Sequence, residues 1–248
     1  MIKVVIHYTC KSSYKIFKAL KDTPGVEFEV AKTPYFTYLK RYVVSVPAVF
    51  YNDELTLLDP VEPSDVVTLR DGKNEKELPI EEAVENFIKG VLASQALLTI
   101  TMLYKSIKPI LDPQLVAVLS RAKYHRQEAK TPQILEKLRK DDGEIIKEKW
   151  DILTKSLTFG LVRELYWLGI DIDSIEKPHV KMWLLAKATV GRLGLPTPTP
   201  TVPEDVADAV YKILRDAGRR YLDKIAEEQK TIQADVEYNR YTNNINIL

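Results

Sequence analysis

Residues 2–20 decide the fold, and they read IKVVIHYTCKSSYKIFKAL. The segment Ile2 to Tyr8 is rich in β-branched residues, which predicts a strand. From residue 11 to about 22, apolar residues recur at three-residue steps, which predicts a helix with one apolar face. Cys10 therefore lies at the turn where a strand passes into a helix.

The rest of the first 60 residues continues this alternation of short elements. Residues 26–30 alternate apolar and polar side chains, as a half-buried strand does, and Thr33-Pro34 is a helix start for a segment to about Tyr42. Residues 48–51 and 55–58 flank Asn52-Asp53-Glu54 and predict a hairpin. A helix between the first two strands implies a parallel pair with a right-handed crossover.

Residues 60–78 are ambiguous, because Val66 to Arg70 suits either a strand or a short helix capped by Ser64. We favour the helix, since the sheet needs one to cover it. Beyond Pro79 the apolar spacing is helical. Helices are expected at about 80–108, 113–124, 132–141, 144–169, 179–193 and 203–230, the last opened by a capping box from Thr201, with an extended connection at 195–200. We expect an α/β domain in 1–72, an all-helical domain in 79–235 and a flexible tail in 236–248.

Composition excludes several classes of function. The 248 residues carry 36 Lys and Arg against 35 Asp and Glu, so the net charge of +1 predicts neither a nucleic-acid partner nor a membrane partner. The apolar run from Val91 to Leu103 is shorter than the roughly 18–20 residues of a membrane span. One cysteine allows no intramolecular disulfide, and no histidine pair has metal-ligand spacing, so no metal site is expected. With no signal-peptide pattern at the N-terminus, a cytoplasmic protein is predicted.

The position of Cys10 points to thiol chemistry. A cysteine at the first turn of a helix faces free backbone N–H groups and the positive end of the helix dipole, and both favour the thiolate. Lys11 and Lys15 add positive potential, and the Ser13 hydroxyl can donate a hydrogen bond to the sulfur. Ser13 cannot attack a mixed disulfide, so an external thiol must resolve Cys10.

Two motifs, together with the order of elements, resemble the thioredoxin superfamily in its glutaredoxin and glutathione-transferase branch. Cys10-Lys11-Ser12-Ser13 looks like a Cys-x-x-Ser version of the redox motif, and Ser45-Val46-Pro47 is similar to the family's cis-proline segment before the third strand. The resemblance covers about residues 1–60 by motif and the remainder by helical content. It implies a thioredoxin-like domain followed by an all-helical domain, as in glutathione transferases.

The resemblance also implies a function, namely a monothiol thiol–disulfide oxidoreductase or thiol transferase. Cys10 would be the nucleophile and Ser13 the thiolate stabiliser, while Lys11, Val46 and Pro47 would shape the substrate site between the two halves. Expected partners are a low-molecular-weight thiol or a protein disulfide, and a homodimer is compatible with the sequence. Glutathione is one candidate thiol, but the family's acidic-residue–Ser pair after the fourth strand is interrupted here, as Glu62-Pro63-Ser64.

Two readings without thiol chemistry stay open. In one, the fold is a scaffold and the helical domain docks a protein partner. In the other, the protein is chaperone-like and uses the backbone edge at Pro47 to hold extended chains. A buried, inert cysteine suits both, because free cysteine is among the most buried residue types.

Overall fold

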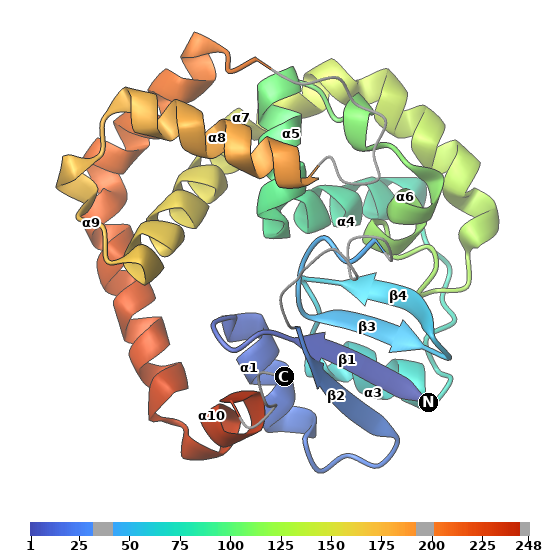
Figure 1. Cartoon of the computed structure of the whole chain (residues 1–248). Helices are drawn as coiled ribbons and strands as arrows, with labels where there is room; N and C mark the ends of the chain where they lie inside the picture. The colour runs from blue at the N-terminus through green and yellow to red at the C-terminus, as the bar shows by residue number, and fades with distance from the viewer. Residues whose placement is uncertain (32–41, 192–200, 244–248) are drawn as a thin grey trace.

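The computed structural model describes residues 1–31, 42–191 and 201–243. A small mixed sheet with its covering helices forms the N-terminal part, and the remainder is mostly helical (Figure 1). The helix expected from Thr33 to about Tyr42 lies outside the described residues except for Tyr42, and the connection expected at 195–200 lies wholly outside them.

The sheet has the strand order β2-β1-β3-β4. Its strands are β1 (Ile2–Ile6), β2 (Val26–Val30), β3 (Ala48–Tyr51) and β4 (Glu54–Leu58). Strand β1 pairs with β2 in parallel and with β3 antiparallel, and β3 pairs with β4 antiparallel. The expected parallel pair and hairpin are thus confirmed. At the hairpin turn Asn52 and Asp53 have φ values of 50° and 65°, the left-handed pair that a two-residue hairpin requires.

The described helices cover both faces of the sheet and build the rest of the molecule. In chain order they are α1 (Lys11–Leu20), α3 (Pro63–Arg70), α4 (Ile80–Ala93), α5 (Gln95–Tyr104), α6 (Pro113–Leu119), α7 (Thr131–Leu168), α8 (Lys177–Gly191), α9 (Glu204–Ala234) and α10 (Val236–Asn243). Short 3-10 turns occur at Lys108–Ile110, Glu128–Lys130 and Ile172–Ser174. The helical reading of 66–70 is confirmed by α3, which is capped at Glu62 and not at Ser64.

The single helix expected over 80–108 is wrong, because the chain bends by 104° between α4 and α5. Ser94 has an extended backbone at the break, and its hydroxyl accepts from Leu97 N at 3.4 Å and donates to Val44 O at 2.8 Å. These bonds cap the new helix and compete with continuation of the old one. In the part of the chain that the structure describes, no one helix has both the length and the apolar character to cross a membrane, and only the bent pair α4 with α5 meets that test jointly.

Two other helix boundaries differ from expectation. The segments expected at 132–141 and 144–169 form one helix, α7, because Gly143 weakens a helix without forbidding it. Helix α7 ends at Gly169, whose φ of 65° is the left-handed conformation of a common helix C-cap. The capping box expected from Thr201 is absent, since Pro203 occupies the N-cap of α9 and makes no side-chain capping bond.

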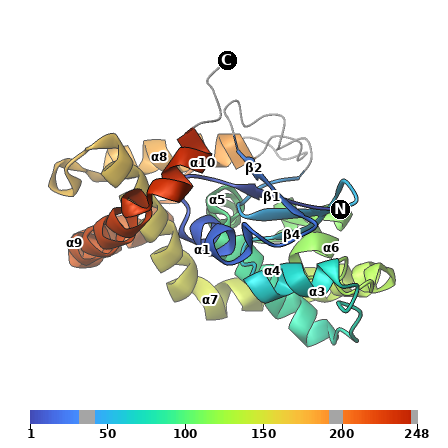
Figure 2. The ribbon, with the colours of Figure 1, turned by 90° about the horizontal axis from the view of Figure 1, so that it is seen from below.

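The expectation of a flexible tail from residue 236 is wrong for the residues that the structure describes. Residues Val236–Asn243 form α10, which lies beside α1 in both views (Figures 1 and 2). Tyr238 is completely buried and packs its ring against Tyr14 and Phe17 of α1. Although the composition of this segment is polar, burial of the large Tyr238 ring stabilises the helix.

Both faces of the sheet are buried. Val4 and Ile6 of β1 point into a cluster with Ile16 and Phe17 of α1. Val5, on the opposite face, belongs to a larger cluster that runs continuously into α4, α5, α7 and α9. The sheet and the helical region therefore share one apolar core.

Candidate functional site

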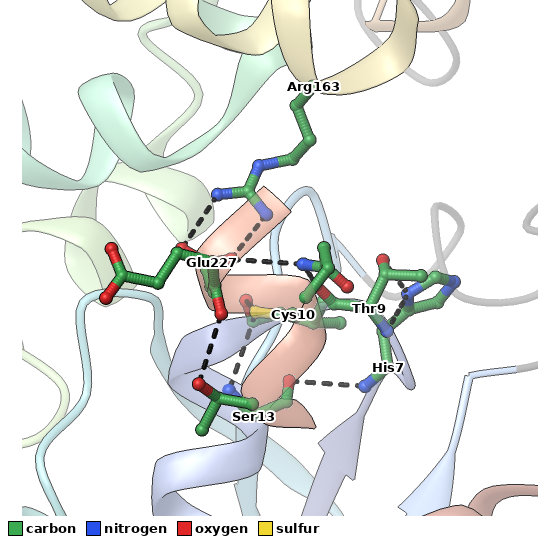
Figure 3. Close-up of polar contacts among 10 residues, drawn as sticks. His7, Thr9, Cys10, Ser13, Arg163 and Glu227 are labelled. Carbon is green, nitrogen blue, oxygen red and sulfur yellow. Dashed lines mark hydrogen bonds and ion pairs between the residues drawn. The ribbon is translucent and has the colours of Figure 1, made fainter. Parts of the chain in front are cut away.

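Cys10 lies between β1 and α1, as expected, and is the N-cap of α1 (Figure 3). Its backbone is extended, with φ of −91° and ψ of 121°, and its Sγ accepts a hydrogen bond from Ser13 N at 3.5 Å. The side chain is half-buried. The sulfur thus occupies the place where a helix N-terminus offers free N–H groups.

Ser13 lies directly beneath the sulfur and is completely buried. Its Oγ accepts from His7 N at 3.2 Å, which ties α1 to the end of β1. The Ser13 hydroxyl and backbone amide both hydrogen-bond to the sulfur and lower the pKa of Cys10. The expected role of Ser13 as the stabiliser of a thiolate stays a prediction.

The segment before β3 faces the same sulfur. The Val46–Pro47 peptide is cis, and the Cys10 thiol donates to Val46 O at 3.3 Å. The structure thus brings Cys10, Ser13, Val46 and Pro47 together. Lys11 is exposed on the first turn of α1, away from these contacts.

The expectation of a stabilised thiolate is opposed by the surroundings of Cys10. Burial raises the pKa of the Cys10 thiol, the carboxylate of Asp59 raises it further, and the hydrogen bonds from Ser13 and Ser12 only partly offset these effects. Desolvation disfavours a charged sulfur more than the helix end favours it. Lys15 supplies no uncompensated charge, because it pairs with Glu62.

Asp59 is the residue of this site that sequence reasoning missed. It follows β4, is half-buried, and accepts hydrogen bonds from the Ser12 side chain and the Val61 backbone. Burial raises its pKa to about 6, against the lowering effect of those bonds. The sequence signal for Asp59 is a carboxylate directly after a buried strand, whereas Glu62, the acidic residue considered in the sequence, caps α3.

His7 and its neighbours form the other wall of the turn. Thr9 N donates to His7 Nδ1 at 3.3 Å, so the Nδ1 atom is an acceptor, and burial lowers the pKa of His7. The Tyr8 ring lies on the His7 ring and contacts the Trp167 ring edge-on at the end of α7. Tyr8 and Trp167 are both exposed.

Side chains from the C-terminal helices also reach the turn before Cys10. Gln229 Nε2 donates to Thr9 O and Tyr238 Oη donates to His7 O, each at 2.9 Å. No local sequence pattern could have indicated these contacts, because 220 and 231 positions separate the partners.

A cavity of about 290 Å³ adjoins the loop that carries Asp59. Leu58, Pro60 and Glu62 line it from the sheet side, and Lys89 and Arg121 from the helical side. It therefore lies between the two halves, although Cys10 is not among its lining residues. Within 1–31, 42–191 and 201–243, no three His, Cys, Asp or Glu side chains gather in a way that could hold a metal ion.

Comparison with known proteins identified no relative of this chain. The scan against family models, the search of curated proteins and the search of solved structures each returned no match. The chain's own contacts therefore carry the functional argument.

Proposed function

We propose that the protein is a monothiol thiol–disulfide oxidoreductase or thiol transferase that uses Cys10. The observation that carries this proposal is the position of the Cys10 sulfur. It caps α1 through Ser13 N and lies 3.3 Å from the Val46 carbonyl, beside Pro47. A thiol and a backbone hydrogen-bonding edge are thereby side by side, as exchange with an extended disulfide substrate needs.

The topology supports a thioredoxin-like reading of residues 1–72 with a glutathione-transferase-like helical region after it. A parallel β1–β2 pair, an antiparallel β3–β4 hairpin and a helix at the end of β1 are the arrangement that the resemblance implies. The single cysteine supports a reducing compartment, and we assign the protein to the cytoplasm.

The exchange proceeds in two balanced steps. The Cys10 thiol loses its proton to a solvent base, and the thiolate attacks one sulfur of a disulfide RS–SR′. The S–S bond breaks, R′S⁻ leaves and takes up a proton, and Cys10 keeps RS in a mixed disulfide. An external low-molecular-weight thiolate XS⁻, from glutathione or another thiol, then attacks the RS sulfur of that mixed disulfide, which forms RS–SX and releases Cys10 as thiolate.

Deprotonation changes the Val46 carbonyl as well as the sulfur. In the thiol form, Val46 O accepts the Cys10 S–H. Loss of the proton frees that oxygen, because a thiolate has no hydrogen to donate. A substrate backbone N–H can then bind Val46 O beside the reactive sulfur, which couples activation of Cys10 to capture of an extended chain.

A second candidate function is a binding module without thiol chemistry. The raised pKa of Cys10 favours it, since burial and Asp59 keep the sulfur in the less reactive thiol form. In that case the S–H···O bond to Val46 is a structural contact that fixes the loop before β3.

The rate of mixed-disulfide formation decides between the two functions. Native protein would be mixed with a glutathionylated peptide at several pH values, and the modified Cys10 counted by mass spectrometry. We expect the rate per thiolate to exceed at least tenfold that of an unstructured peptide with residues 5–15. The Cys10→Ser variant is the matched control and should form no adduct while keeping its unfolding midpoint. A native rate per thiolate no greater than the peptide's would leave the binding module as the function.

A further inference from the structure

The turn before Cys10 is held by two side chains from the far end of the chain. Tyr238 of α10 donates its hydroxyl to His7 O, and Gln229 of α9 donates its amide to Thr9 O. Both side chains are completely buried, so water does not compete for these bonds. The two carbonyls belong to the residues on either side of Tyr8, immediately before the sulfur.

The bond from Tyr238 acts on the oxygen that also fixes Cys10 itself. Cys10 N donates to His7 O at 3.0 Å, so this carbonyl accepts from both the cysteine amide and the tyrosine hydroxyl. Any movement of His7 O moves the residue that places the sulfur at the N-cap. Cys10 and Tyr238 also interact electrostatically. Burial raises the pKa of the Tyr238 hydroxyl, and the charge of an ionised Cys10 raises it further.

The bond from Gln229 is anchored in turn to α7. Gln229 Nε2 also donates to Glu228 Oε1 at 3.2 Å, and Arg163 donates to both Glu228 oxygens, at 2.6 and 3.3 Å. The Gln229 amide nitrogen thus faces two acceptors, while its Oε1 is buried with no hydrogen-bond partner among the residues that the structure describes.

We propose that Tyr238 and Gln229 are positioning residues for Cys10: acting through the His7 and Thr9 carbonyls, they hold the turn that directs the Cys10 sulfur toward Val46 O. The proposal rests on Cys10 being the reactive group of the proposed function. The C-terminal helices would then control the reactivity of a thiol more than 200 positions away.

Loss of either bond has a defined consequence for the sulfur. A looser turn lets the thiol leave Val46 O and gain contact with water. Burial is the main cause that raises the pKa of Cys10, so better hydration lowers that pKa. If these residues had only a structural role, their substitution would reduce stability and leave the titration of Cys10 unchanged.

The test compares two tyrosines of the same helix. Tyr238→Phe removes the hydroxyl that reaches His7 O, and Tyr241→Phe removes one that donates to Phe28 O at 2.8 Å, away from the turn. The rate of Cys10 alkylation by iodoacetamide would be measured from pH 6 to 10. For Tyr238→Phe we expect the midpoint to fall by about half a pH unit, which raises the rate at pH 7 about threefold. Tyr241→Phe should match the unmodified protein.

Gln229→Leu provides a second variant, with a similar side-chain volume and no amide. It should shift the alkylation midpoint in the same direction as Tyr238→Phe. Unchanged midpoints in both variants, or an equal shift in Tyr241→Phe, would overturn the positioning role. Alkylation needs no disulfide substrate, so a protein that fails to exchange thiols but shows these shifts would contradict the proposed function alone.

Discussion

Asp59 and Ser13 act on the Cys10 sulfur in opposite directions. The Asp59 carboxylate raises the pKa of the thiol, whereas hydrogen bonds from Ser13 lower it. Burial is the largest influence and acts with Asp59. Substitutions at these two positions therefore separate the charge effect from the hydrogen-bond effect on one titrating group.

Replacing the Asp59 carboxylate by an amide should activate the thiol and stabilise the protein at neutral pH. Asp59→Asn removes a nearby negative charge, so the pKa of Cys10 falls and iodoacetamide labels it faster at pH 7. The pKa of Asp59 is raised from 3.8 to about 6. The contribution of Asp59 to the free energy of unfolding is therefore fully favourable below pH 3.8 and is lost as pH rises through 6. The variant should gain about 2 kcal/mol at pH 7 in urea unfolding.

A surface carboxylate in the same part of the molecule is the control for Asp59. The side chain of Asp22 is 89% exposed. The Asp22→Asn variant should therefore change neither the labelling rate of Cys10 nor the stability of the protein. Equal labelling rates for Asp59→Asn and the unmodified protein would contradict the assigned charge effect.

Ser13→Ala should act in the opposite sense on the thiol. It removes a hydrogen bond to the sulfur, so the pKa of Cys10 rises and labelling at pH 7 slows. It also leaves the His7 N–H without its acceptor, at a cost of about 1–3 kcal/mol in urea unfolding. Ser120→Ala, at another completely buried serine, should lose stability without changing Cys10. Faster labelling of Ser13→Ala than of the unmodified protein would contradict the effect assigned to the Ser13 hydrogen bond.

At the scale of elements, helix α7 contains two glycines with different surroundings. A Cβ added at Gly143 would meet no atom of the described residues within 4 Å, whereas a Cβ at Gly160 would collide with the end of the Gln95 side chain. Gln95 donates to Ser156 O at 3.3 Å across the contact between α5 and α7. The same residue type therefore weakens the helix at one position and permits close packing at the other.

The two glycine-to-alanine variants should change stability by different amounts. Gly143→Ala should stabilise the protein by about 0.5–1 kcal/mol, because alanine has the higher helix propensity. Gly160→Ala should change stability by less than about 1 kcal/mol, since the Gln95 amide must turn away from Ser156 O and this loss offsets the gain in helix propensity. Urea unfolding of both variants and of the unmodified protein measures the two changes in the free energy of unfolding. Equal gains at both positions would contradict the close contact at Gly160.

At the scale of the whole molecule, the sheet and the helical region are joined by apolar packing. Phe50 and Leu55 of the hairpin belong to the same buried cluster as Phe87 of α4 and Leu157 of α7. The segment between α3 and α4 is also fixed, because Asn74 donates to Tyr124 O and Lys130 donates to Leu78 O. Neither half can unfold without exposing apolar surface of the other.

Unfolding should accordingly be one cooperative transition. Trp150, Trp167 and Trp183 all lie in the helical region and report on it by fluorescence, whereas the accessibility of Cys10 reports on the N-terminal half. Tryptophan emission and pulse labelling of Cys10 should give the same urea midpoint. Labelling that becomes complete at clearly lower urea would indicate a separately folding N-terminal unit.

Much of the fold was predictable because its signals are local. The strand at Ile2–Ile6, the helix after Cys10 and the hairpin around Asn52 follow from apolar periodicity and turn residues. The failures share one cause, which is that contacts distant in sequence overrode local patterns. Ser94 breaks a helix by bonding to Val44 O, and Tyr238 orders a polar tail by filling a space beside α1.

The sequence by itself determined where the thiol lies, because a strand followed by an amphipathic helix can place Cys10 only at the helix N-cap. It also determined that no second thiol is available to resolve a mixed disulfide. Only the tertiary structure decided the proton affinity of that thiol. Burial and the Asp59 carboxylate act through space, and the contacts from α9 and α10 join residues more than 200 positions apart, so local sequence could not disclose them.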